Sequence, residues 1–284
     1  RPRLSAARYE LLPLRQSDIP LLIEVYKHWQ TYDEYMVLED LEEAEFFAVK
    51  CSKRGNDVYE ARLETRLGFL KTRSVDHEYF SSDFKGSSSK SVSPIVLWVT
   101  LTYDSKLCSL DEAWTRIMPD FNDMITRLRD HYFSVHYIMF PQPFPSPNGK
   151  AYGYPHIHCV LIIEGATFNI FPSMEEVSGE LRLVYRIKER DEFRSIADWH
   201  SWVDVKALRT SGHLYAYVTN YSRRSMIGDT PKVDVNNAVL WLYRKNGFNL
   251  SGFFKARYLD LITTVHDYGG SEAVLEAPRY KFHG

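Results

Sequence analysis

The sequence of 284 residues lacks the features that mark exported or membrane-bound proteins. No apolar run reaches the roughly 18 residues that a helix needs to cross a bilayer, and the opening residues, RPRLSAARYE, contain no apolar export segment. Only three cysteines are present, far apart and in no CxxC pair, which argues against a disulfide framework and a cysteine zinc site. We therefore expect a cytoplasmic protein with no membrane partner.

The chain also has little net charge and no nucleotide-binding loop. Its formal net charge is −2, so composition alone does not indicate a nucleic-acid ligand. The charge is uneven, however, because residues 206–284 carry 11 basic and 6 acidic side chains, whereas residues 33–45 hold seven carboxylates and no base. Phosphate binding needs only a local positive face. No GxxxxGK[ST] motif occurs, so any helicase activity must come from another protein.

The clearest boundary in the chain lies at residues 81–93 (SSDFKGSSSKSVS). Seven serines and a glycine in thirteen residues are typical of a flexible loop or linker. Before this stretch, residues 17–73 are mostly compatible with helix, since apolar residues recur there at helical spacing. The acidic residues 33–45 are then expected to form a solvated helix face.

After the serine-rich stretch, the pattern changes to alternating strands and helices. Runs of β-branched and aromatic residues predict strands, and apolar residues three or four apart predict helices. Strands are expected at 95–103, 133–140, 155–163 and 202–208, and helices at 114–128, after a capping box at 109–112, and at 211–225. This order is typical of an α+β fold of the ferredoxin/RRM-like class, an antiparallel sheet with helices packed on one face.

Two histidines mark the third of these strands. In the segment YPHIHCVLII (154–163), His156 and His158 are two residues apart, so on a strand both side chains point to the same face, about 7 Å apart. Two imidazoles at that spacing are near enough to bind one metal ion. A proline-rich loop precedes them, so the ion would lie at the start of the strand, where it could remain open to a substrate.

The segment containing this pair resembles the HUH motif (His, bulky hydrophobic residue, His) of rolling-circle replication initiators, relaxases and single-strand transposases. Two further segments resemble the initiators' other motifs, in the same order: VTLT at 99–102, and YVTNYSRR at 217–224, with tyrosines four apart and basic residues following. Together with segments resembling the initiators' flanking strand and tail, the similarity covers roughly residues 95–252. The tyrosines follow the histidines, whereas relaxases usually place the tyrosine first.

The resemblance implies a metal-dependent endonuclease of the HUH fold. Mg²⁺ or Mn²⁺ would be held by His156 and His158, and the hydroxyl of Tyr221 would attack a phosphate of single-stranded DNA, leaving a 5′-phosphotyrosyl link and a free 3′-OH. Positions four apart lie on one helical face about 6 Å apart, so Tyr217 can serve a second transfer.

Two positions depart from the family pattern. The lysine that usually precedes the second tyrosine is Asn220 here, so either Arg223 or Arg224 supplies the positive charge or the phosphotyrosine step is tuned differently. Both arginines are expected to bind DNA. The usual glutamate ligand is also absent from residues 137–143, where Gln142 is the candidate third ligand. His136, Asp104 or a water are the alternatives for that position.

We thus expect a mostly helical accessory region at 1–93, an HUH endonuclease domain at 94–252, and a tail at 253–284 that packs on or extends it. The function expected is initiation of rolling-circle replication, by nicking and joining single-stranded DNA at an origin, with a host polymerase and helicase as partners. Three alternatives remain: a single-strand transposase, a nucleotide hydrolase of the histidine-triad type, which Val160 argues against, and a non-catalytic RRM-like nucleic-acid-binding protein.

Overall fold

The computed structural model of the chain describes residues 11–68, 90–92, 95–177, 179–208, 211–256 and 280–283. Its helices are η1 (Gln16–Asp18), α2 (Ile19–Gln30), α3 (Asp57–Gly68), α4 (Leu110–Tyr132), α5 (Arg190–Ala197), α6 (Ser211–Met226) and α7 (Pro231–Leu242). Its strands are β1 (Tyr35–Asp40), β2 (Glu45–Lys50), β3 (Lys90–Val92), β4 (Ile95–Thr102), β5 (Ser134–Pro143), β6 (Pro155–Glu164), β7 (Phe168–Val177), β8 (Glu180–Ile187), β9 (Val203–Ala207), β10 (Asn249–Leu250) and β11 (Tyr280–His283).

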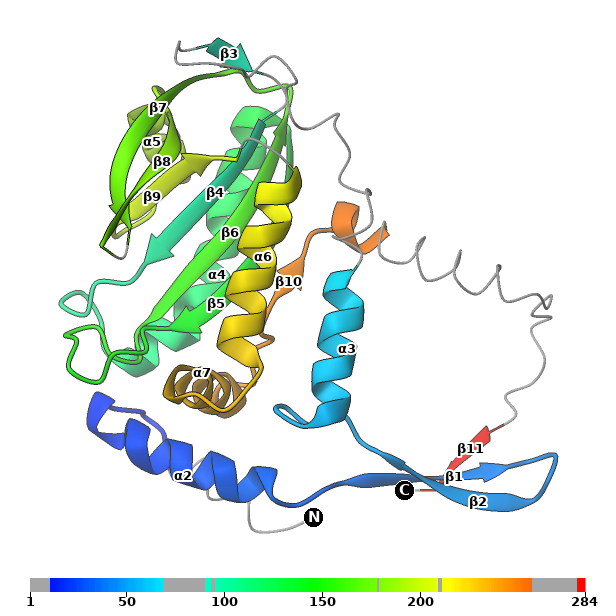
Figure 1. Ribbon diagram of the computed structural model, residues 1–284. Helices are drawn as coiled ribbons and strands as arrows, with labels where there is room; N and C mark the ends of the chain where they lie inside the picture. The colour runs from blue at the N-terminus through cyan, green and yellow to red at the C-terminus, as the bar shows by residue number, and fades with distance from the viewer. Residues whose placement is uncertain are drawn as a thin grey trace.

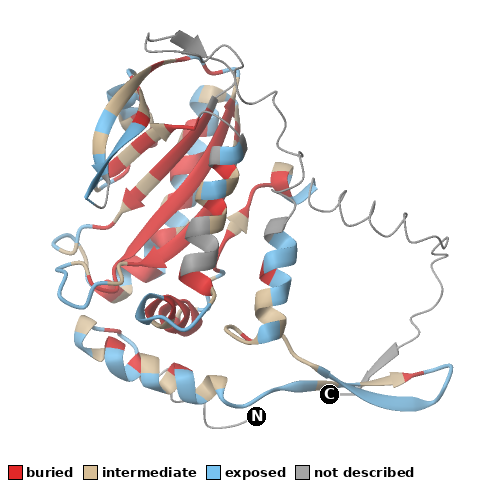
Figure 2. Cartoon of the chain, in the orientation of Figure 1, coloured by how far each residue is buried: buried red, intermediate tan, exposed pale blue. Residues whose placement is uncertain are grey.

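A five-stranded antiparallel sheet lies at the centre of the fold, in the order β10-β5-β6-β4-β9 (Figure 1). The strands expected from the sequence at β4, β5, β6 and β9 are confirmed, as are the helices α4 and α6. Strand β6 is the middle strand, and all its residues except the last are buried (Figure 2). The chain is therefore a mixed α/β protein built on an antiparallel sheet.

Helices cover both faces of this sheet, so the expectation of helices on one face is wrong. Phe121 of α4 belongs to the same hydrophobic cluster as Ile157 and Leu161 of β6, on one face. Val218 of α6 belongs to a second cluster with Val160, on the other face. The reason is the sequence of β6, which is apolar on both sides, so each face must be covered to bury it.

The N-terminal helix α2 is part of the main hydrophobic core. Ile19, Leu22 and Tyr26 are buried in the cluster that contains α4, and the ring of Tyr26 lies 5.9 Å from that of Trp241 in α7. The proposed boundary at residue 93 remains a prediction, but the packing makes α2 and the central sheet parts of one core.

This packing gives a direct prediction for stability. Leu22 is fully buried, whereas its neighbour Leu21 is 53% exposed. Leu22→Ala should lower the free energy of unfolding of the chain by about 2–5 kcal/mol, because it removes buried methyl groups and leaves a cavity. Leu21→Ala, the matched control, should change it by less than about 0.5 kcal/mol. Denaturant titration measures both, and a separate early transition in Leu22→Ala, with the main one unchanged, would instead make the N-terminal region an independent module.

The acidic stretch 33–45 forms the first strand and the turn of a β-hairpin that spans residues 35–50, not the expected helix. Strands β1 and β2 pair in antiparallel register from Tyr35↔Lys50 to Asp40↔Glu45, and β11 pairs with the other edge of β1. Asp40 explains the turn, since its carboxylate accepts hydrogen bonds from the backbone N–H groups of Glu42 and Glu43. The apolar residues of both strands also fit a sheet better than a helix.

Most of the serine-rich stretch 81–93 lies outside the described residues, so its expected flexibility stays a prediction. Its residues Lys90–Val92 form the short strand β3, which pairs with β7.

The β7–β8 hairpin and helices α5 and α7 were not expected from the sequence.

Candidate functional site

The two histidines lie side by side in the middle strand of the sheet, on the face that α6 covers. His156 has Gln142 of β5 as its partner on one side and Thr102 of β4 on the other. His158 is flanked in the same way by Phe140 and Thr100. The sheet thus brings Gln142 directly opposite His156, as a ligand of a shared ion would have to be.

The imidazole rings are close enough to bind a single ion. Their centroids are 4.7 Å apart and the rings are nearly perpendicular. Thr100 Oγ1 lies 3.2 Å from His158 Nδ1, a hydrogen bond that orients this ring and leaves Nε2 as its ligand atom. His156 Nδ1 is buried and has no hydrogen-bond partner among the described residues. A buried nitrogen of this kind is costly unless something binds it.

Burial keeps both histidines in the neutral form that binds metals. Desolvation, assisted by the positive charge of Lys232, lowers the pKa of His156 to about 3. Desolvation also lowers the pKa of His158 well below its usual value, and His156, Lys232 and Lys206 add to the effect. Neither ring therefore needs to lose a proton near neutral pH before it can act as a ligand.

Gln142 is held in place by the helix above it. The side chain is buried, and its amide nitrogen donates a hydrogen bond of 2.9 Å to Ser225 Oγ of α6. Within the part of the chain that the structure describes, no group of three His, Cys, Asp or Glu residues is arranged to hold a metal. A site here therefore depends on the two imidazoles and an amide oxygen.

The structure does not bring the other two candidate ligands to the histidines. His136 pairs with Ile162, six residues along β6 from His156, a distance of about 20 Å. Its ring stacks on Phe253 at 4.2 Å and lies 3.4 Å from a carboxylate oxygen of Glu164. Asp104 is exposed beyond the end of β4, and its carboxylate accepts a hydrogen bond from the backbone N–H of Lys106.

Contacts near both ends of helix α6 show how it is oriented relative to β6, the strand that carries the histidines. The ring of Tyr217 lies 4.9 Å from that of Trp98, which pairs with Val160 and stacks on His158 at 5.4 Å. Two helical turns later, Ser225 contacts Gln142, the partner of His156. The helix therefore runs antiparallel to β6 along this face.

Position 221 falls midway along this helical stripe. Residue 221 lies on α6 one helical turn from Tyr217, which contacts Trp98, and one turn from Ser225, which contacts Gln142. The side chains of Tyr221, Arg223 and Arg224 are outside the part of the chain that the structure describes.

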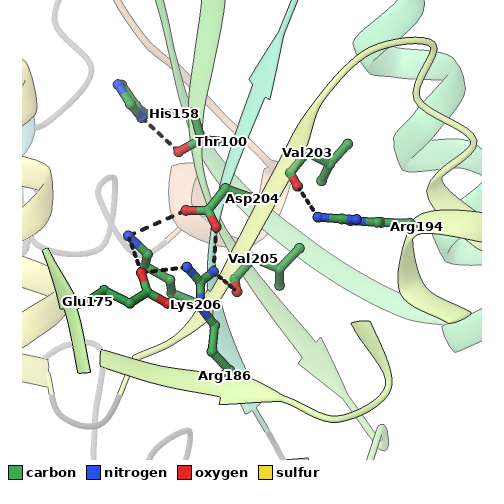
Figure 3. A network of polar contacts seen from close by, with 9 residues as sticks. All are labelled: Thr100, His158, Glu175, Arg186, Arg194, Val203, Asp204, Val205 and Lys206. Carbon is green, nitrogen blue, oxygen red and sulfur yellow. Dashed lines mark hydrogen bonds and ion pairs between the residues drawn. The ribbon is translucent and has the colours of Figure 1, made fainter. Parts of the chain in front are cut away.

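Sequence reasoning missed a polar network beside His158, which Figure 3 shows. Asp204 of β9 pairs with Thr100, the hydrogen-bond partner of His158. The Asp204 carboxylate is bound by Arg186 of β8 and lies 3.4 Å from Lys206 Nζ, and Arg186 also pairs with Glu175 of β7. The alternation in VDVKA (203–207) places Asp204 and Lys206 on one face of β9. Their ion-pair partners come from β7 and β8, which are distant in sequence, so the sequence alone did not show the network.

No protein-family model, curated protein or solved structure matches this chain. Among the helices of the described residues, none combines the length and the apolar character that crossing a membrane requires.

Proposed function

We propose that this chain is an HUH-type endonuclease that initiates rolling-circle replication by nicking and rejoining single-stranded DNA. One observation carries the proposal: the helix bearing Tyr217 and Tyr221 lies over the sheet face that holds His156 and His158. The two pairs of residues come from segments about 60 residues apart in the sequence, and the fold packs α6 against the sheet face that holds the histidines. If the two histidines served only to pack the core, no tyrosines would be needed on the helix that covers them.

The residues present fit a divalent metal. His156 and His158 would hold it through neutral ring nitrogens, one of which is buried without a hydrogen-bond partner among the described residues. The amide oxygen of Gln142 would complete the set. When bound, the ion would polarise a non-bridging oxygen of the scissile phosphate and so favour attack on phosphorus. Nitrogen ligands prefer transition metals, so Mn²⁺ should support activity better than Mg²⁺.

The protein groups would supply the nucleophile and the charge around it. The hydroxyl oxygen of Tyr221 would form the ester bond to phosphorus, and the bond to the 3′ oxygen would break, leaving a 3′-OH and a 5′-phosphotyrosine. Lys232 is near enough to lower the pKa values of both histidines. Its positive charge would therefore also favour the approach of a phosphate.

The chemical nature of the cleaved ends tests this proposal. A single-stranded oligonucleotide that is cut in Mn²⁺ should yield a 3′-OH fragment that a DNA polymerase extends, while the 5′ side of the cut remains attached to protein. Release of a free 5′-phosphate, with no protein attached at any time, would indicate hydrolysis by water and would contradict the tyrosine mechanism.

Gln142 allows a separate test of the metal site. Gln142→Ala should weaken Mn²⁺ binding by about 10–100-fold, on the scale of losing an outer-shell partner of a metal ligand, because the oxygen opposite His156 is removed. Gln142→Glu should retain binding, since a carboxylate keeps that oxygen. Ser225→Ala removes the hydrogen bond that holds Gln142 but keeps the amide oxygen, so it should weaken Mn²⁺ binding less than Gln142→Ala does. Calorimetric titration measures all three, and a Gln142→Ala curve that overlays wild type would place the third ligand elsewhere.

A further inference from the structure

A small pocket lined by three arginines lies between α3 and the turn that follows α7. Its volume is about 160 Å³, and its lining includes Arg54, Arg62, Arg66, Tyr59 and Phe248. None of the described residues that line it is acidic. A site for one water needs only about 10–15 Å³ by this measure, so the space is large enough to admit a phosphate group.

Charge is segregated around helix α3. At 100° per residue, Tyr59, Arg62 and Arg66 fall on one stripe of the helix, which also contains the buried Leu63. The three carboxylates of the helix fall outside this stripe: Asp57, Glu60 and Glu64. Among the residues that the structure describes, none of the three pocket arginines forms an ion pair with a carboxylate.

Aromatic rings and a backbone carbonyl hold two of the guanidinium groups in position. Arg66 lies over the ring of Phe248, 4.8 Å from its centroid, and Arg54 lies 5.5 Å from that of Tyr59. Arg54 also donates a hydrogen bond of 2.6 Å to the backbone oxygen of Lys245. Guanidinium groups that are already positioned lose less entropy when an anion binds, and their planar fork suits phosphate oxygens.

The pocket adjoins the proposed nuclease site. The ring of Phe248 lies 6.2 Å from that of Phe140, the strand partner of His158, and strand partners lie about 5 Å apart. Gly247 packs against Met226, the residue after Ser225, so closely that a Cβ there would lie 2.3 Å from the Met226 sulfur. The arginine pocket and the histidines are therefore separated by only a few packed side chains.

We infer that this pocket binds a backbone phosphate of the single-stranded DNA that flanks the cut. The inference rests on the proposed function only for the identity of the ligand. The N-terminal part of the chain thereby gains a role, because α3 supplies Arg62 and Arg66, and the residues just before it supply Arg54.

The salt dependence of DNA binding tests the inference. A single-stranded oligonucleotide is titrated in EDTA, so that no cleavage occurs, at several salt concentrations. Each phosphate neutralised on a single strand contributes about 0.7 to the slope of log K against log[salt], so Arg62→Gln combined with Arg66→Gln, which removes the contact with one phosphate, should reduce the slope by about 0.7. The loss should be similar for all sequences.

Two controls make the result specific. Arg116→Gln removes an exposed arginine of α4, on the opposite face of the sheet, and should leave the slope unchanged. Arg62→Lys combined with Arg66→Lys keeps both charges and should retain most of the slope. Both glutamine substitutions are at exposed positions, and thermal unfolding checks that the fold is intact.

An unchanged slope in the folded glutamine variant would overturn the inference, as would a wild-type chain that binds no strand. Failure of the proposed function gives a different result. If the slope falls as expected but wild type never forms a covalent product in Mn²⁺, the pocket binds phosphate and the nuclease proposal fails. If wild type cleaves and the glutamine variant keeps the full slope, only the pocket is wrong.

Discussion

Tyr221→Phe should abolish the covalent protein–DNA adduct and reduce nicking by about 10³-fold or more, the scale of losing a covalent nucleophile. The change removes a single hydroxyl and keeps the ring, so the fold should be preserved. Position 221 lies on α6 between Tyr217, which contacts Trp98, and Ser225, which contacts Gln142. A denaturing gel that detects labelled DNA attached to protein measures the loss.

The neighbouring tyrosines provide matched controls for this result. Tyr217→Phe should still cut a single site but should fail to join ends, because Tyr217 lies one turn earlier on the same stripe and is assigned the second transfer. Tyr215→Phe should retain both steps, since position 215 falls outside that stripe. Loss of the adduct in Tyr217→Phe, together with its persistence in Tyr221→Phe, would exchange the two roles.

Replacing either histidine should have an effect of similar size on metal-dependent cleavage. In His156→Ala or His158→Ala, the remaining ligands should bind Mn²⁺ more than about 100-fold more weakly, since even outer-shell losses cost 10–100-fold. Nicking should then fall to background, and wild type in EDTA should behave in the same way. Calorimetric titration with Mn²⁺ measures the binding, and gel assays of cleavage measure the activity.

His136→Ala is the control for this prediction, because His136 lies on the same sheet face but about 20 Å along it. It should leave metal binding unchanged. His156→Gln and His158→Gln fill more of the space than alanine does, so they separate loss of a ligand from loss of packing. Full cleavage by a folded double variant in EDTA would show that the histidines are structural.

The central sheet was predictable because its signals are local. The β-branched and aromatic content of segments such as β4 and β6 depends only on neighbouring residues, and so does the 3.6-residue period of α4. The spacing of His156 and His158 also fixes their shared face without further information. Gln142 lies opposite His156 because of the register between β5 and β6. The proline-rich loop that joins these strands does not specify that register, so the sequence could not predict the pairing.

Two expectations were wrong: helices on only one face of the sheet, and a helix in the acidic stretch 33–45. The first depends on burial and the second on the chemistry of a turn. The β6 sequence is apolar on both faces, and this pattern already contained the evidence for helices on both sides of the sheet. In the acidic stretch, carboxylates obscured the alternation, and the turn set by Asp40 was not recognised. The arginine pocket could not have been found from sequence, because it joins residues 54–66 to residues 246–248.

The most direct test of the central claim is to identify the residue that becomes attached to DNA. The full chain is incubated with a library of single-stranded oligonucleotides in Mn²⁺, then digested with protease and nuclease, and analysed by mass spectrometry. We predict a peptide that carries a nucleotide on Tyr221, formed only when the metal is present. The absence of any tyrosine-linked nucleotide, under conditions in which Mn²⁺ binds and the oligonucleotides are bound, would contradict the assignment of this chain as an HUH endonuclease.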